Sequence, residues 1–209
     1  MQDWNAIITV RDRGFKRAFT VFREFGPISE TGYFNVLTLR AHDTRRLMES
    51  LREKLLENPE FLAGIARIIP VSRTFTFNTP EDFGVKARES VLAVAQQMAG
   101  KRFYIRMHRR GFKGQISSME EERFLSAILL EHLGQIGDPG KVDYTDPDAV
   151  IVIETLGQWA GLSVWTREDM LRYPFLGLGA PHAGTEGRMP VPQSEPSEPC
   201  RDCPGDLSS

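Results

Sequence analysis

Five consecutive apolar residues, Ala149 to Ile153, constrain the fold of this chain more than any other feature. The run lacks the apolar–polar alternation of a strand with one solvated face, so it predicts a strand that is buried on both sides. The turn residues Asp146-Pro147-Asp148 mark where this strand begins. Because helical patterns flank the run on either side, we expect an α/β (α+β) fold in which helices cover a small mixed sheet.

Strand and helix patterns alternate through residues 1–78, which we expect to form one domain. Strand patterns lie over residues 6–10, 33–41 and 71–77, and helix patterns lie over residues 13–25 and from Asp43 to Asn58. Asp43 is a good N-cap, and Asn58-Pro59 ends the second helix. The order strand, helix, strand, helix, strand predicts a ferredoxin-like N-terminal domain.

A second domain is predicted over residues 79–179, beginning where Thr79-Pro80 supplies an N-cap and a first helical residue. The elements expected after it are a helix to Gly100, a strand over 102–110, a helix from Ser117-Ser118, the buried strand, a strand over 159–165 and a short helix from Thr166. The second half therefore predicts helix, strand, helix, strand, strand.

Charge is distributed unevenly along the 209 residues. The whole chain carries 26 basic and 28 acidic residues, and this net charge of -2, taken over the whole chain, argues against a nucleic-acid-binding protein. Residues 180–209 hold six of the 13 prolines, five acidic and two basic residues and no aromatic residue, which predicts a disordered acidic tail. Without this tail the chain has one more basic than acidic residue.

The densest charge feature is a group of six basic residues between positions 101 and 113 with no acidic residue among them. They are Lys101, Arg102, Arg106, Arg109, Arg110 and Lys113. Along the predicted strand, Tyr104, Arg106, His108 and Arg110 share one face. Arginine suits phosphate groups and an exposed tyrosine can stack on a base, so this face suggests RNA. The alternative is a solvated face balanced by residues 120–122.

Four segments resemble the THUMP domain in their order and spacing. They are residues 103–111, the helix from Ser118, Val142-Asp143-Tyr144 followed by Asp146-Pro147-Asp148, and Tyr173-Pro174-Phe175-Leu176-Gly177. The resemblance covers residues 80–179, and Tyr144 stands where the family usually has leucine. Residues 1–78 resemble the small ferredoxin-like domain that precedes THUMP, and Ile68-Ile69-Pro70-Val71 matches the stretch that leads into it in stand-alone members.

The resemblance implies RNA binding, specifically capture of the acceptor end of tRNA on behalf of a tRNA-modifying enzyme. Only the tail follows Gly179, so the stand-alone members are the nearest in kind. The stand-alone members resemble adaptors that serve a tRNA cytidine acetyltransferase, and this acetyltransferase is a separate protein that carries out the chemistry. We therefore expect a cytoplasmic, non-catalytic tRNA-binding adaptor that needs no cofactor.

The residues expected to contact RNA follow from the basic segment. Phosphate contacts are predicted at Arg106, Arg109, Arg110 and Lys113, with Tyr104, His108, Lys101 and Arg73 as further candidates and Arg13, Lys16 and Arg17 as secondary ones. The sequence shows no nucleophile motif and no dinucleotide-binding or P-loop motif, so no active site is predicted.

The sequence is also compatible with three other functions. Cys200 and Cys203 have the spacing of half a zinc site, so the chain could be a protein-interaction or zinc-linked module with a THUMP-like fold, although one pair supplies only two of four ligands. It could also be the RNA-binding half of a split tRNA methyltransferase or thiolation system. The third alternative is an enzyme in its own right.

Overall fold

The computed structural model describes residues 4–11 and 13–178, so the expected tail with Cys200 and Cys203 lies outside the described residues. The first half contains β1 (Ala6–Val10), α1 (Phe15–Phe22), β2 (Ile28–Glu30), β3 (Val36–Leu39), α2 (Thr44–Glu57) and β4 (Ile65–Pro70). Their sheet has the order β2-β3-β1-β4 with every pair antiparallel. This βαββαβ arrangement is ferredoxin-like, as the sequence predicted.

The strand that completes this first sheet differs from the one expected. The sequence pattern over residues 71–77 predicts a strand of the N-terminal domain, but β5 (Arg73–Thr76) pairs with β9 (Trp159–Thr166) in the second sheet. The position beside β1 is taken by β4, whose Ile68 and Ile69 are fully buried. In β5 only Phe75 is even half-buried, so this strand suits the edge of a sheet rather than a core position.

The second sheet has the order β5-β9-β8-β6-β7. It is formed by β6 (Arg102–His108), β7 (Lys141–Val142), β8 (Ala149–Leu156), β9 and β5, with β6 and β8 parallel and β8 and β9 antiparallel. All eight residues of β8 are buried. The strand predicted from the apolar run at residues 149–153 is thus confirmed, and it lies in the middle of the sheet.

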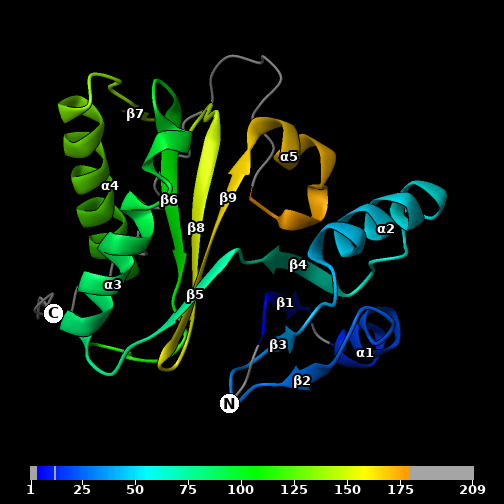
Figure 1. The fold of residues 1–209 in the computed structure, drawn as a ribbon. Coiled ribbons are helices and arrows are strands. Elements are labelled where there is room, and N and C mark those ends of the chain that lie inside the picture. The colour runs from blue at the N-terminus through cyan, green and yellow to red at the C-terminus, as the bar shows by residue number, and fades with distance from the viewer. Residues whose placement is uncertain (1–3, 12, 179–209) are drawn as a thin grey trace, which may run out of the picture.

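Helices cover one face of the second sheet and the N-terminal half covers the other. In Figure 1, α3 (Pro80–Leu92) and α4 (Ser118–Gln135) lie on one side of β6 and β8, while α5 (Arg167–Arg172) and the first sheet lie on the other. Short 3-10 helices, Ala95–Met98 and Pro174–Leu176, follow α3 and α5. Tyr104, Val150 and Val152 belong to the same buried cluster as β1 and β4, so the two halves share one core.

The predicted helix starts are confirmed by their capping hydrogen bonds. Asp43 accepts from the backbone N–H groups of Arg45 and Arg46 at 2.9 and 3.0 Å. Thr79 accepts from Asp82 N at 3.2 Å, and the side chain of Ser117 caps α4. Side-chain acceptors at these positions satisfy N–H groups that have no partner within the helix. Among the described residues, no helix is both long and apolar enough to cross a membrane.

Candidate nucleic-acid interface

The last residues of β6 lie where the two sheets meet. His108 of β6 is opposite Glu154 of β8, and in the first sheet Thr9 of β1 is opposite Arg67 of β4. The guanidinium of Arg110 reaches the hydroxyl of Thr9 at 3.3 Å, and that of Arg67 reaches the same hydroxyl at 3.5 Å. Side chains from both halves of the molecule therefore converge at this point.

A fully buried carboxylate, Glu154, organises this convergence. It forms an ion pair with Arg110, and its other oxygen lies 3.7 Å from Nη2 of Arg67 and 4.0 Å from Nε2 of His108. Burial raises the pKa of the Glu154 carboxyl, while the two guanidinium groups act in the opposite direction. We call Arg67, His108, Arg110 and Glu154 the end cluster, because they lie at the end of β6.

His108 contributes no charge to the end cluster. Burial and the positive charges of Arg67, Arg110 and Arg106 lower the pKa of His108 to about 3. The imidazole is therefore neutral near pH 7, and Nη1 of Arg67 lies 2.8 Å from its Nε2. His108 thus acts as a hydrogen-bond acceptor that orients Arg67. The end cluster holds two arginines against one carboxylate, which leaves an excess of positive charge.

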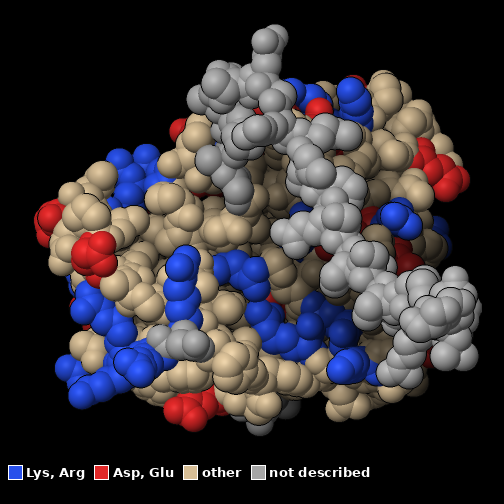
Figure 2. Space-filling model, turned by 180° about the vertical axis from the view of Figure 1, so that it is seen from behind, with Lys and Arg blue, Asp and Glu red and all other residues tan. Residues whose placement is uncertain are grey.

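Further basic side chains lie beside the end cluster or close to its residues in the chain. The side chain of Arg106 is 44% exposed and lies 3.9 Å from Glu122, and Lys113 is exposed in the loop that follows β6. Arg11 is exposed directly after β1, where its N–H bonds Gly64 O at 2.8 Å. We call Arg11, Arg67, Arg106, Arg110 and Lys113 the basic face. Seen from behind, Lys and Arg side chains gather in a band across the molecule with few acidic ones between them (Figure 2).

Three of the predicted RNA-contact residues have other roles in the structure. Tyr104 is only 5% exposed, donates its hydroxyl proton to Leu178 O at 3.0 Å and packs on Tyr144 with ring centres 5.4 Å apart. The ring of Tyr104 is packed inside the protein, so it is not exposed for the stacking on a base that the sequence predicts. Arg110 is bound to Glu154, and Arg109 donates to the carbonyl of Gly111, so both arginines have intramolecular partners.

Two other predicted residues lie away from the basic face. Lys101 precedes β6 and therefore lies at the opposite end of this strand from Arg110. Arg73 lies on β5, which is separated from β6 by β9 and β8. β5 is three strand spacings from β6, which corresponds to about 14 Å. The secondary candidates Arg13, Lys16 and Arg17 are exposed close to Arg11 in the sequence, and Arg17 donates to Phe61 O.

Sequence reasoning missed Arg67 and Glu154. Each is the only charged residue in a strand that is otherwise largely apolar, β4 and β8 respectively. Charged residues are almost never fully buried unless they are paired, so a lone charge within such a run is a usable signal. It predicts a buried ion pair, although it cannot name the partner.

A cavity of about 550 Å³ adjoins the basic face along the free edge of β6. It is lined by Tyr104, Arg106, Met107, His108, Ser118, Met119, Glu122, Gly177 and Leu178. β7 pairs only with Arg102 and Phe103, so the rest of this edge is open to the start of α4. The N-terminus of a helix carries partial positive charge, which adds to that of Arg106. The carboxylate of Glu122 also lines the cavity, and Glu120 and Glu121 lie in the first turn of α4, so acidic groups offset this positive charge as the sequence alternative expected.

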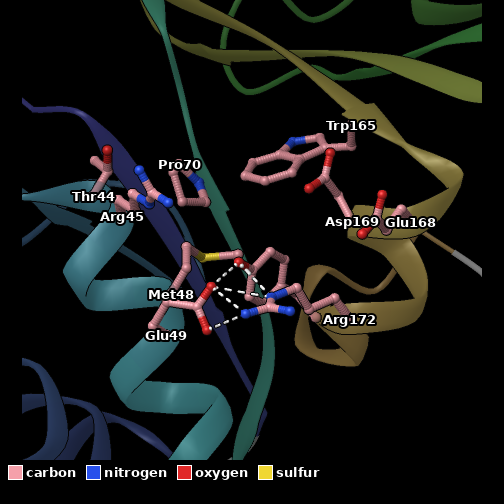
Figure 3. Close-up of a pocket in the computed structure, with 10 residues that line it drawn as sticks. Thr44, Arg45, Met48, Glu49, Pro70, Trp165, Glu168, Asp169 and Arg172 are labelled. Carbon is pink, nitrogen blue, oxygen red and sulfur yellow. Dashed lines mark hydrogen bonds and ion pairs between the residues drawn. The ribbon is translucent and has the colours of Figure 1, made fainter.

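A second cavity, of about 560 Å³, lies between α2 and α5 (Figure 3). Glu49 accepts from Arg172 Nη2 at 2.9 Å and from the hydroxyl of Tyr173 at 2.6 Å, and Asp169 accepts from the N–H of Thr166. The carboxylates of Glu49 and Asp169 thus hold α2 to α5 and cap α5. Among the described residues, no three His, Cys, Asp or Glu side chains are placed to hold a metal ion. We assign the candidate site to the basic face.

Comparison with known proteins places the fold. No protein-family model matches the sequence, and no curated protein matches it. PH1313 from Pyrococcus horikoshii is 14% identical with a TM-score of 0.55, covering 78% of this chain and 55% of that one. TrmN from Thermus thermophilus is 15% identical with a TM-score of 0.52, covering 76% and 44%. The chain spans about half the length of these structures, and its fold is THUMP-like.

Proposed function

We propose that the protein binds tRNA through the basic face and presents it to a separate tRNA-modifying enzyme. The single observation that carries this proposal is the excess of positive charge where the two halves meet, in a chain whose net charge is -2. Phosphate contacts supply most of the non-specific affinity for nucleic acids. A local basic surface on a near-neutral protein supports a tRNA-binding role of moderate affinity.

The adaptor role rests on the sequence resemblance to stand-alone THUMP proteins, which implies a tRNA cytidine acetyltransferase as partner. In this proposal the chain itself is not catalytic. Arg106 and Lys113 contact phosphates directly, while Arg67 and Arg110 contribute positive potential from within the end cluster. The acceptor end of the tRNA is the part that the resemblance implies is bound.

A second candidate function is the RNA-binding half of a split tRNA methyltransferase or thiolation system. The coverage of the two similar structures favours this candidate. The present chain covers 55% of PH1313 and 44% of TrmN, so both proteins contain further residues beyond the common fold. The two candidates share the RNA-binding step and differ in the reaction that the partner carries out.

One experiment tests binding and a second identifies the reaction. A gel shift with total tRNA at low salt should give a discrete complex; the absence of a complex would exclude both candidates. Nucleoside analysis of tRNA from cells that lack this protein should then show loss of one modified base. Loss of an acetylated cytidine supports the adaptor, and loss of a methylated or thiolated base supports the split system.

A further inference from the structure

Phe34 is the most exposed large apolar side chain of the described residues. It is 85% exposed, and it forms no ring contact with any other described residue. Leu56, Leu171 and Tyr144 are also exposed, at 71%, 60% and 55%. Single exposed apolar side chains are common on protein surfaces, so exposure alone does not define a site.

The turn that carries Phe34 is held by several hydrogen bonds. The hydroxyl of Thr31 donates to Val36 O at 2.8 Å and accepts from Tyr33 N at 3.2 Å. Val36 N donates to Tyr33 O at 3.3 Å, and Asn35 adopts the left-handed conformation with φ of 58°. Phe34 is therefore presented from a fixed turn between β2 and β3. A rigid aromatic side chain loses little conformational freedom when it binds a ligand.

This turn adjoins the basic face on both sides of Phe34. Asn35 O accepts from Val10 N at 2.9 Å, directly before Arg11. The hydroxyl of Tyr33 lies against the backbone that follows Arg110, since a Cβ atom placed on Gly111 would be 3.0 Å from it. Gly157 lies against the same backbone segment, because its N–H donates to Arg110 O at 2.8 Å. The two neighbours of Phe34 thus contact the segments that carry two residues of the basic face.

We propose that Phe34 is a stacking platform for an unpaired base of an RNA held by the basic face, an inference that rests on the proposed function. Base faces are free only where RNA is single-stranded, because duplex pairing and stacking cover them. Stacking on an aromatic ring tolerates any base. Phe34 therefore selects single-stranded segments next to the part of the basic face that its turn adjoins, at Arg11 and Arg110, without reading their sequence.

The test compares a short single-stranded oligoribonucleotide with an RNA duplex of equal length, both fluorescently labelled. Phe34→Ala should weaken binding of the single strand by about 5- to 140-fold, the range that loss of one base–aromatic stack corresponds to, and leave duplex binding within about twofold. Phe34→Tyr keeps the ring and should restore binding. Leu171→Ala, which removes an exposed apolar side chain elsewhere, is the matched control.

Failure of this inference and failure of the proposed function give different results. If Arg106→Gln weakens binding of both probes but Phe34→Ala weakens neither, the stacking role is wrong and the RNA-binding role stands. Equal losses on single strand and duplex with Phe34→Ala also contradict stacking. If the wild-type protein binds neither probe nor tRNA, both proposals fail, and the exposed ring is then better explained by a protein partner.

Discussion

The two ends of β6 each carry a cluster of arginines and carboxylates, and the two clusters differ in burial and in charge balance. The start cluster comprises Arg102, Asp146, Asp148 and Arg167, and all four side chains are about one-third exposed or more. Two arginines meet two aspartates there, so the charges cancel. The end cluster surrounds a carboxylate with no exposed surface and holds an excess of positive charge.

This difference separates a structural role from a binding role on the same strand. Hydrogen bonds from Arg102 lower the pKa of Asp148, and bonds from Arg167 lower that of Asp146. The start cluster therefore ties the loop before β8 to α5 and leaves no net charge for a ligand. The end cluster joins the two halves and also contributes to the basic face. We therefore expect an anionic ligand to bind near the end cluster and not near the start cluster.

The largest expected effect comes from removing the buried carboxylate. Glu154→Gln leaves the partly buried guanidinium groups of Arg67 and Arg110 without their counter-charge, and breaking a buried ion pair typically costs about 3 to 5 kcal/mol. Urea unfolding at pH 7.5 measures the free energy of unfolding. A loss below about 1 kcal/mol would show that Glu154 is not the carboxylate that holds the two halves together.

A smaller effect is expected from the pH dependence of His108. Its folded-state pKa of about 3 lies below the ordinary value of 6.5, so the unfolded chain binds the proton first as the pH falls. This contribution to stability is complete above about pH 6.5 and decreases as the pH falls toward 3. Between pH 7.5 and 5, wild type should lose about 1 to 2 kcal/mol more than His108→Gln. Equal losses would place a protonated imidazole in the folded protein.

The smallest stability effect is expected at the start cluster. Asp148→Asn removes one carboxylate, but water can solvate Arg102 and Arg167 because both are partly exposed. The variant should unfold at a urea concentration closer to wild type than Glu154→Gln does, and its affinity for tRNA should be unchanged. A loss of stability equal to that of Glu154→Gln would remove the distinction between the two ends of β6.

Local patterns were sufficient to predict the fold class, the strand at residues 102–110 and the buried strand at 149–153. They could not predict the environment of Tyr104, because Leu178 lies 74 residues away in the sequence and covers one side of this strand. Arg67 and His108 are likewise 41 residues apart. Alternation along a strand shows which side chains share a face, whereas the packing of distant segments decides which of them remain exposed.

The assignment of β5 shows the same limit. Residues 73–76 follow β4 closely in the chain, so sequence order placed them in the N-terminal domain. Their pairing with β9 depends on residues 159–162, which are far away in the sequence. Arg73, a candidate RNA contact in the sequence, therefore lies on the strand farthest from β6 on that side of the sheet.

The salt dependence of tRNA binding tests the central claim most directly. Arg106→Gln combined with Lys113→Gln should reduce the slope of log K against log salt by about 1.5, since each lost phosphate contact accounts for about 0.7 to 0.9. The matched control, Arg73→Gln with Arg88→Gln, removes the same charge from exposed positions on β5 and α3 and should keep the wild-type slope. Equal slopes for wild type and the first variant would contradict binding at the basic face.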